Sequence, residues 1–135
     1  MIRFLIAVCL GLPLPASAQN FTTAAEVKPI LEATRSAWIA LRPWEGQELL
    51  YFTHLESWRC GVAEVRFSVN SSATTRVWPM DPCYEGTAQP NAIGADRKPY
   101  TELPADLAET VSVLVVLKDG TELRQDYTRA QILMR

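Results

Sequence analysis

The sequence predicts an α+β, mainly β fold, in which an N-terminal amphipathic helix packs on an antiparallel sheet of about five strands, with a sandwich-like arrangement as one alternative. Three observations support this prediction. Apolar residues recur at helical spacing between residues 27 and 41. From Glu48 onward they alternate with a period of two, as in strands. Two cysteines, Cys60 and Cys83, are placed to brace the sheet with a disulfide.

The helix is predicted to begin at a capping box formed by Thr23 and Glu26. Pro29 lies beyond the first turn, so the helix either kinks there or begins near it. Its end is open, because residues 38–41 before the turn at 43–46 equally suit a short strand. The apolar positions with helical spacing, which place Trp38 in the core, are Val27, Ile30, Leu31, Thr34, Trp38 and Leu41.

The first predicted strand covers residues 49–55, and both of its faces are largely apolar. Strands of this kind are usually internal in a sheet. The alternation places His54 on one face with Leu50 and Phe52.

A β-hairpin is predicted from residues 65–69 and 75–79, with Asn70-Ser71-Ser72 between them. If the turn centres between Ser71 and Ser72, Cys60 falls opposite Cys83, as a disulfide requires, but Phe67 faces Arg76.

A register one residue over pairs Phe67 with Val77 and brings apolar faces together. We favour this second register, since a slip by one residue exchanges the two faces of a strand. A bulge near Pro79 or Pro82 would then bring the two cysteines back into line.

The most hydrophobic strand, residues 111–117, is predicted to be central. A three-residue turn with Gly120 in the left-handed region pairs Val115 with Leu123 and Val111 with Tyr127, which matches better than a two-residue turn. Residues 132–134 are predicted to form a last short strand.

Residues 1–18 have the layout of a secretory signal peptide: a positive Arg3, an apolar run and a small-x-small site at Ala16-Ser17-Ala18. Residues 19–135 then form one disulfide-containing globular domain. Lipidation at Cys9 is disfavoured because Val8 precedes it. No apolar run reaches the roughly 20 residues that span a bilayer, so no membrane insertion is expected after signal removal.

Removal of residues 1–18 takes away one basic and no acidic residue, which moves the net charge from −2 to −3. No basic patch is visible, so nucleic acid is not expected as a partner. His54 is the single histidine and the remaining cysteines are predicted to be bridged, so neither a metal nor another cofactor is expected.

His54 is the one candidate for a general base, with Asp81 or Glu56 to orient it and a serine as nucleophile. The chain has no G-x-S-x-G elbow, so no catalytic residue is assigned. A hydrogen-bonded structural histidine is the favoured interpretation.

The candidate interaction surface consists of Trp44, Trp58, Tyr84 and Tyr100. Exposed aromatic residues are common anchors at interfaces, and Trp44 lies in a predicted turn. The segment from Tyr84 to Tyr100 has no periodic pattern, so it is predicted to be either the loop that meets a partner or a passive connection. The Asn70-Ser71-Ser72 sequon matches the N-glycosylation motif.

Residues 49–70 (LLYFTHLESWRCGVAEVRFSVN) and 77–93 (VWPMDPCYEGTAQPNAI) resemble a group of small exported alphaproteobacterial proteins of unknown function. The resemblance implies a periplasmic setting and transfers no functional residue. Our leading hypothesis is a non-enzymatic periplasmic or secreted binding module whose partner is a protein or another envelope component. The alternatives are a small hydrolase centred on His54 and a secreted enzyme inhibitor.

Overall fold

The computed structural model describes residues 10–11 and 20–135. The predicted signal peptide and its cleavage site before Gln19 lie outside these residues, apart from Leu10 and Gly11. None of the helices in the described ranges combines the length and the apolar character needed to cross a membrane.

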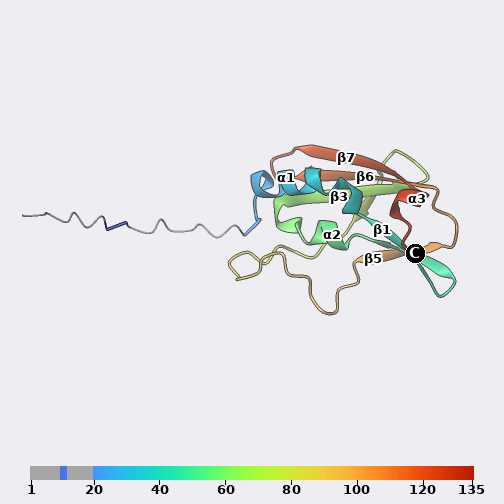
Figure 1. Ribbon diagram of the computed structural model, residues 1–135, viewed down its shortest axis with the longest axis horizontal. Helices are drawn as coiled ribbons and strands as arrows, with labels where there is room; N and C mark the ends of the chain where they lie inside the picture. The colour runs from blue at the N-terminus through green and yellow to red at the C-terminus, as the bar shows by residue number, and fades with distance from the viewer. Residues whose placement is uncertain (1–9, 12–19) are drawn as a thin grey trace, which may run out of the picture.

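The part of the chain that is described folds into two antiparallel sheets with short helices at their ends, which confirms the α+β, mainly β class (Figure 1). The three-stranded sheet has the order β1-β2-β5 and the four-stranded sheet the order β4-β3-β6-β7. The strands are β1 Ala40–Trp44, β2 Gln47–Tyr51, β3 Val62–Val69, β4 Arg76–Trp78, β5 Tyr100–Pro104, β6 Thr110–Leu117 and β7 Glu122–Thr128. The α-helices are α1 Ala24–Ala33, α2 Thr53–Glu56 and α3 Arg129–Ile132, and 3₁₀ turns cover Arg35–Ala37 and Arg59–Gly61.

Helix α1 begins at the predicted cap, where the Thr23 hydroxyl accepts a hydrogen bond from the Glu26 amide at 3.3 Å. It continues through Pro29 and ends at Ala33. Of the two alternatives left open for residues 38–41, the strand is the one observed, because β1 begins at Ala40. The chain turns after the helix, and the indole of Trp38 donates to the Leu31 carbonyl at 2.9 Å, which fastens this turn to the helix. Trp38 is fully buried, as predicted.

The helix packs directly against Gly61, the last residue of the 3₁₀ turn that precedes β3. A Cβ atom at this position would lie 2.4 Å from the Val27 side chain and 2.7 Å from the Thr23 carbonyl oxygen. Only glycine allows this approach, which is one reason the N-terminal helix lies across the end of the four-stranded sheet.

Strands β1 and β2 form a hairpin whose turn residues, Glu45 and Gly46, have φ values of 47° and 78°. Such a two-residue turn suits the twist of paired strands. Strand β2 ends at Tyr51, and after Phe52 the four residues Thr53–Glu56 form α2. The predicted strand over residues 49–55 is therefore too long, and His54 lies on a helical turn rather than on a strand face.

The central hairpin of the four-stranded sheet has the predicted register, with Val115 opposite Leu123 and Val111 opposite Tyr127. Gly120 has a φ of 86°, in the left-handed region, and its amide donates to the Leu117 carbonyl at 2.9 Å. The prediction of a turn with a glycine in this conformation is confirmed.

The β3–β4 register is the one we did not favour. Phe67 lies opposite Arg76 and Val65 opposite Trp78, which overturns the pairing of Phe67 with Val77. Phe67 does not need an apolar residue opposite it in this register, because the Arg76 guanidinium covers its ring at 4.7 Å. No compensating bulge near the prolines is needed, since this register already brings the cysteines together.

The disulfide between Cys60 and Cys83 is present, with a Cα–Cα distance of 4.9 Å. Near the C-terminus, the predicted strand over residues 132–134 is replaced by α3 and a single parallel bridge between Leu41 and Leu133. The Met134 amide also donates to the Leu41 carbonyl at 2.8 Å, so the chain end lies along the outer edge of β1.

The inner faces of both sheets contribute to one hydrophobic cluster. The three-stranded sheet provides Leu41, Leu50 and Leu103, and the four-stranded sheet provides residues such as Phe67 and Val113. The opposite face of the three-stranded sheet is left outside this core.

Candidate functional site

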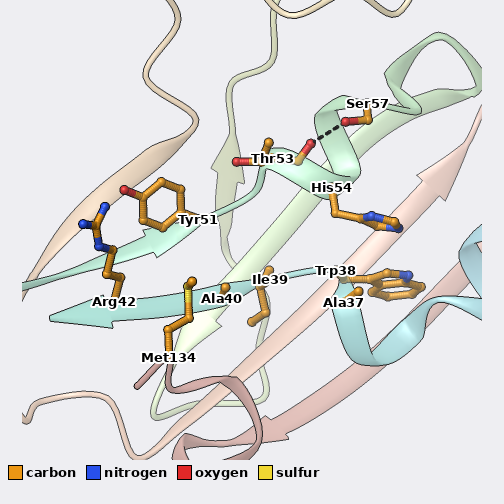
Figure 2. Close-up of a pocket in the computed structure, with 10 residues that line it drawn as sticks. All are labelled: Ala37, Trp38, Ile39, Ala40, Arg42, Tyr51, Thr53, His54, Ser57 and Met134. Carbon is orange, nitrogen blue, oxygen red and sulfur yellow. Dashed lines mark hydrogen bonds between the residues drawn. The ribbon is translucent and has the colours of Figure 1, made fainter.

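A pocket of about 530 Å³ opens where the start of β1 meets α2. This volume is within the usual range for small-ligand sites, roughly 300–1,000 Å³. Figure 2 shows its ten lining residues: Ala37, Trp38, Ile39, Ala40, Arg42, Tyr51, Thr53, His54, Ser57 and Met134. Apolar groups form most of the wall, and a few hydroxyls, one imidazole and one guanidinium supply the polar groups.

Strand alternation sets which side chains face this pocket. Leu41 points into the core, so Ala40, Arg42 and Trp44 share the outer face of the sheet. Tyr51 lies opposite Ala40 in the register, which places its side chain on the same face, diagonal to Arg42.

Two of the predicted interaction residues are brought to this outer face, Trp44 at the hairpin end of β1 and Tyr100 on β5. Trp44 is 48 % exposed, and the Arg42 guanidinium lies 4.6 Å from the centre of its ring. Tyr100 is half-buried and contacts Tyr51, with 5.2 Å between the ring centres. We call Arg42, Trp44, Tyr51 and Tyr100 the aromatic face.

The helical turn α2 delivers His54 to the other end of the pocket. The Nε2 atom of His54 lies 2.8 Å from the hydroxyl oxygen of Thr34. That hydroxyl already donates its proton to the Ile30 carbonyl at 2.7 Å, so it accepts from Nε2–H. The hydrogen bonds therefore select the Nε2–H tautomer and leave Nδ1 as an acceptor.

Burial lowers the pKa of the His54 imidazole below its ordinary value of 6.5, because the charged ring is poorly solvated there. The ring is therefore neutral near pH 7. Its Nδ1 atom has no partner in the described part of the chain, and it is not fully buried, so it is open to a ligand or to solvent.

The arrangement that a hydrolase would need is not assembled around His54. The Glu56 carboxylate accepts from Arg97 at 2.7 Å and from the Trp78 indole at 3.2 Å. Asp81 lies 3.8 Å from Arg97. Among the described residues, neither of these proposed orienting carboxylates bonds to His54, and its hydrogen-bonded hydroxyl is held by Ile30.

The hydroxyl of Ser57, which lines the pocket, donates to the Thr53 carbonyl at 2.9 Å rather than to an imidazole (Figure 2). The described ranges contain no group of three or more His, Cys, Asp or Glu side chains placed to hold a metal ion. The pocket thus offers apolar contacts and hydrogen-bonding groups, without a nucleophile and base in contact.

Arg59 holds the aperiodic segment that follows β4. Its side chain is 3 % exposed and donates to four backbone carbonyls, at distances of 2.8 to 3.1 Å. The carbonyls belong to Glu56, Pro82, Asn91 and Ala92. This segment is therefore fastened along part of its length.

Asn91 provides a second attachment. Its side-chain oxygen accepts from the Cys60 amide at 2.8 Å, and its amide group donates to the Phe21 carbonyl at 3.1 Å. Between these anchors and the disulfide, residues 84–89 remain exposed and lie far from the β1–β2 hairpin (Figure 1). A role for 84–100 in partner binding stays a prediction.

The other two predicted interaction residues lie apart from the aromatic face. Tyr84 is 38 % exposed, and the Arg59 guanidinium lies 5.1 Å from its ring centre. Trp58 is half-buried and packs edge-on against Phe21, with 5.1 Å between ring centres. Its Nε1 is fully buried without a hydrogen-bond partner, alone in this respect among side-chain polar atoms of the described residues.

The sequon residue Asn70 has a structural role. Its side-chain oxygen accepts from the amides of Glu109 and Thr110 at 2.7 and 3.1 Å, and its Nδ2 donates to the Leu107 carbonyl at 2.8 Å. The atom to which a glycan would be attached is thus engaged within the fold.

Sequence reasoning did not find Arg42, Tyr51 or Met134 as site residues. Arg42 and Tyr51 belong to two different strands, and their side chains become neighbours only through the β1–β2 pairing. The signal that was present is the alternation of Ala40, Arg42 and Trp44, which places a cation beside an aromatic residue on one strand face.

The chain matches no protein-family model, no curated protein and no solved structure. The site must therefore be interpreted from its own geometry.

Proposed function

We propose that this chain is a non-enzymatic binding module of the periplasm or the secreted fraction, and that the pocket between β1, β2 and α2 is its ligand site. The observation that carries this proposal is the combination of a concave apolar wall with a few polar groups at its ends, which is typical of ligand sites. The ligand is a component of the cell envelope or an exposed group of a partner protein.

The exported setting is supported by three features. One is the Cys60–Cys83 disulfide, since such bridges persist in oxidising compartments. The others are the predicted signal peptide and the resemblance to small exported proteins.

Binding is favoured over hydrolysis because His54 is committed to Thr34 and has no carboxylate to orient it in the described part of the chain. A perturbed histidine in a pocket is also consistent with catalysis. The decisive difference is geometric, since a general base must contact the group from which it removes a proton.

The proposal is tested by NMR titration of the disulfide-bonded protein with phenylacetamide, a neutral apolar probe. We expect amide shifts that cluster at Ala40, Thr53 and His54. Ala40→Trp fills the floor of the pocket and should abolish them. Ala130→Trp, at an exposed position on α3, is the matched control and should leave them unchanged.

The proposal fails if the probe shifts no pocket residue at millimolar concentration, or if both tryptophan variants bind it equally. Turnover of p-nitrophenyl acetate that disappears in His54→Gln, with the melting temperature unchanged, would instead support the hydrolase alternative.

A further inference from the structure

Near pH 7, Arg42 is the one charged side chain among the described residues that line the pocket. Arg42 and His54 line it, and no aspartate or glutamate does so among the residues described. Arg42 is exposed and has no carboxylate within 4.0 Å in the described part of the chain. An unneutralised guanidinium at the rim of an apolar pocket is complementary to an anionic group.

Trp44 holds that guanidinium in place. Arg42 lies over the Trp44 ring at 4.6 Å. Stacking uses the flat face of a guanidinium and leaves the N–H groups along its edge free, and these match the two oxygens of a carboxylate. Trp44 is therefore a positioning residue for Arg42.

The remainder of the pocket suits an apolar body. Ile39, Ala40 and Met134 line one side, and Trp38 lies next to His54 at the far end (Figure 2). Ala40 leaves room above the strand, and methionine adapts its shape readily to a bound group. Met134 is 50 % exposed, so it can move without opening the core.

The two polar ends of the pocket differ in charge. Near pH 7 the His54 ring is neutral and presents an acceptor, whereas Arg42 carries a full positive charge. The anionic group is therefore expected at the Arg42 end alone, with its apolar part directed toward His54.

We infer that the pocket selects ligands with a carboxylate next to an apolar group, the carboxylate binding Arg42 and the apolar group filling the space over Ala40. This inference rests on the proposed function. The same chemistry is offered by a small free acid and by the C-terminal residue of a peptide.

The test compares phenylacetate with phenylacetamide, which have nearly the same size and differ in charge. The wild-type protein is expected to bind phenylacetate roughly tenfold more tightly, as a charge-assisted hydrogen bond provides. In Arg42→Gln this preference should vanish while phenylacetamide binding is retained.

Arg76→Gln is the matched control, because Arg76 also lies over an aromatic ring but belongs to β4, outside the pocket. It should keep the full preference. Trp44→Leu should keep part of the preference for phenylacetate, because Arg42 stays charged but no longer stacks on an indole ring. This intermediate result separates a positioning role from a purely structural one, for which both probes would weaken equally.

Equal binding of the two probes to the wild-type protein overturns the inference and leaves the proposed function standing. Loss of the preference in Arg76→Gln as well would overturn it too, because the effect would then reflect general surface charge. Failure of both probes to bind overturns both proposals.

The source of the carboxylate is distinguished with acetyl-Ala-Phe as the free acid and as the amide. Tighter binding of the peptide acid than of phenylacetate assigns the site to polypeptide C-termini. The reverse order assigns it to small organic acids, and either result requires that Arg42→Gln removes the preference for the acid.

Discussion

The two sheets are stabilised in different ways. In the four-stranded sheet, the inner faces of β3 and β6 are buried apolar rows that include Val65, Phe67 and Val113. The three-stranded sheet is also held by a partly buried ion pair, in which Arg129 of α3 donates to the Glu48 carboxylate of β2 at 2.8 Å. Its outer face carries the exposed Arg42 and Trp44 and the half-buried Tyr51 and Tyr100 instead of a second layer.

This difference separates the stabilising part of the molecule from the part available for binding. Buried apolar rows leave their side chains little freedom to move, because protein interiors are close-packed. Polar attachments fix a segment at a few points, and the side chains between those points stay available for contacts with a ligand. The candidate pocket lies on the second kind of structure, as sites carried by loops and strand ends often do.

The largest expected effect is in the four-stranded sheet. Phe67 is 1 % exposed and packs against Phe52, with 4.9 Å between ring centres. Phe67→Ala should lower the free energy of unfolding by about 3–5 kcal/mol, measured by urea denaturation. Val77→Ala, at a 51 % exposed position on β4, is the control and should cost little. Similar losses in both variants would contradict the assignment of Phe67 to the core.

The disulfide comes next. Cys60→Ser together with Cys83→Ser should lower the free energy of unfolding by about 2–4 kcal/mol, because the bridge restricts the unfolded chain. Thiol titration of the denatured, unreduced wild-type protein should find neither cysteine free. Two reactive thiols there would show that the bridge is absent.

Arg59→Met tests the polar attachment of the 79–99 segment. Loss of a donor to four carbonyls should cost about 2–3 kcal/mol. Hydrogen exchange should become faster at the Tyr84 amide, which donates to Pro90 within that segment, and remain unchanged in β6. Arg66→Met, whose partner Glu64 lies at the surface, is the control. Equal acceleration in β6 would mean that Arg59 supports the whole fold.

The smallest effect concerns the pH dependence of stability at the pocket. The folded-state pKa of His54 lies below its ordinary value of 6.5, so the unfolded chain binds the proton more readily. The contribution of neutral His54 is complete above that value and is lost as the pH falls below it. His54→Gln should therefore flatten the melting-temperature profile in this range. An unchanged profile would show that the ring titrates equally in both states.

Several elements were predictable from local pattern. The capping box at Thr23, the central strand over residues 111–117 and the Gly120 turn each depend on residues near one another in the sequence. The β3–β4 register was not predicted, because the apolar match of Phe67 with Val77 and the alignment of the two cysteines favour registers that differ by one residue. An arginine stacked on Phe67 satisfies that ring equally well.

The amino-acid pattern is enough to predict the mainly β class, the buried faces of the strongest strands and the pairing of the cysteines, because period-two burial and a single cysteine pair are local or countable features. Tertiary structure alone decided that the chain forms two sheets, that α2 replaces the end of a strand, and that Arg42, Tyr51 and His54 border one pocket. Those outcomes depend on strand pairing and on buried polar contacts such as those of Arg59. Partners of this kind lie far apart in the chain, so no local periodicity records them.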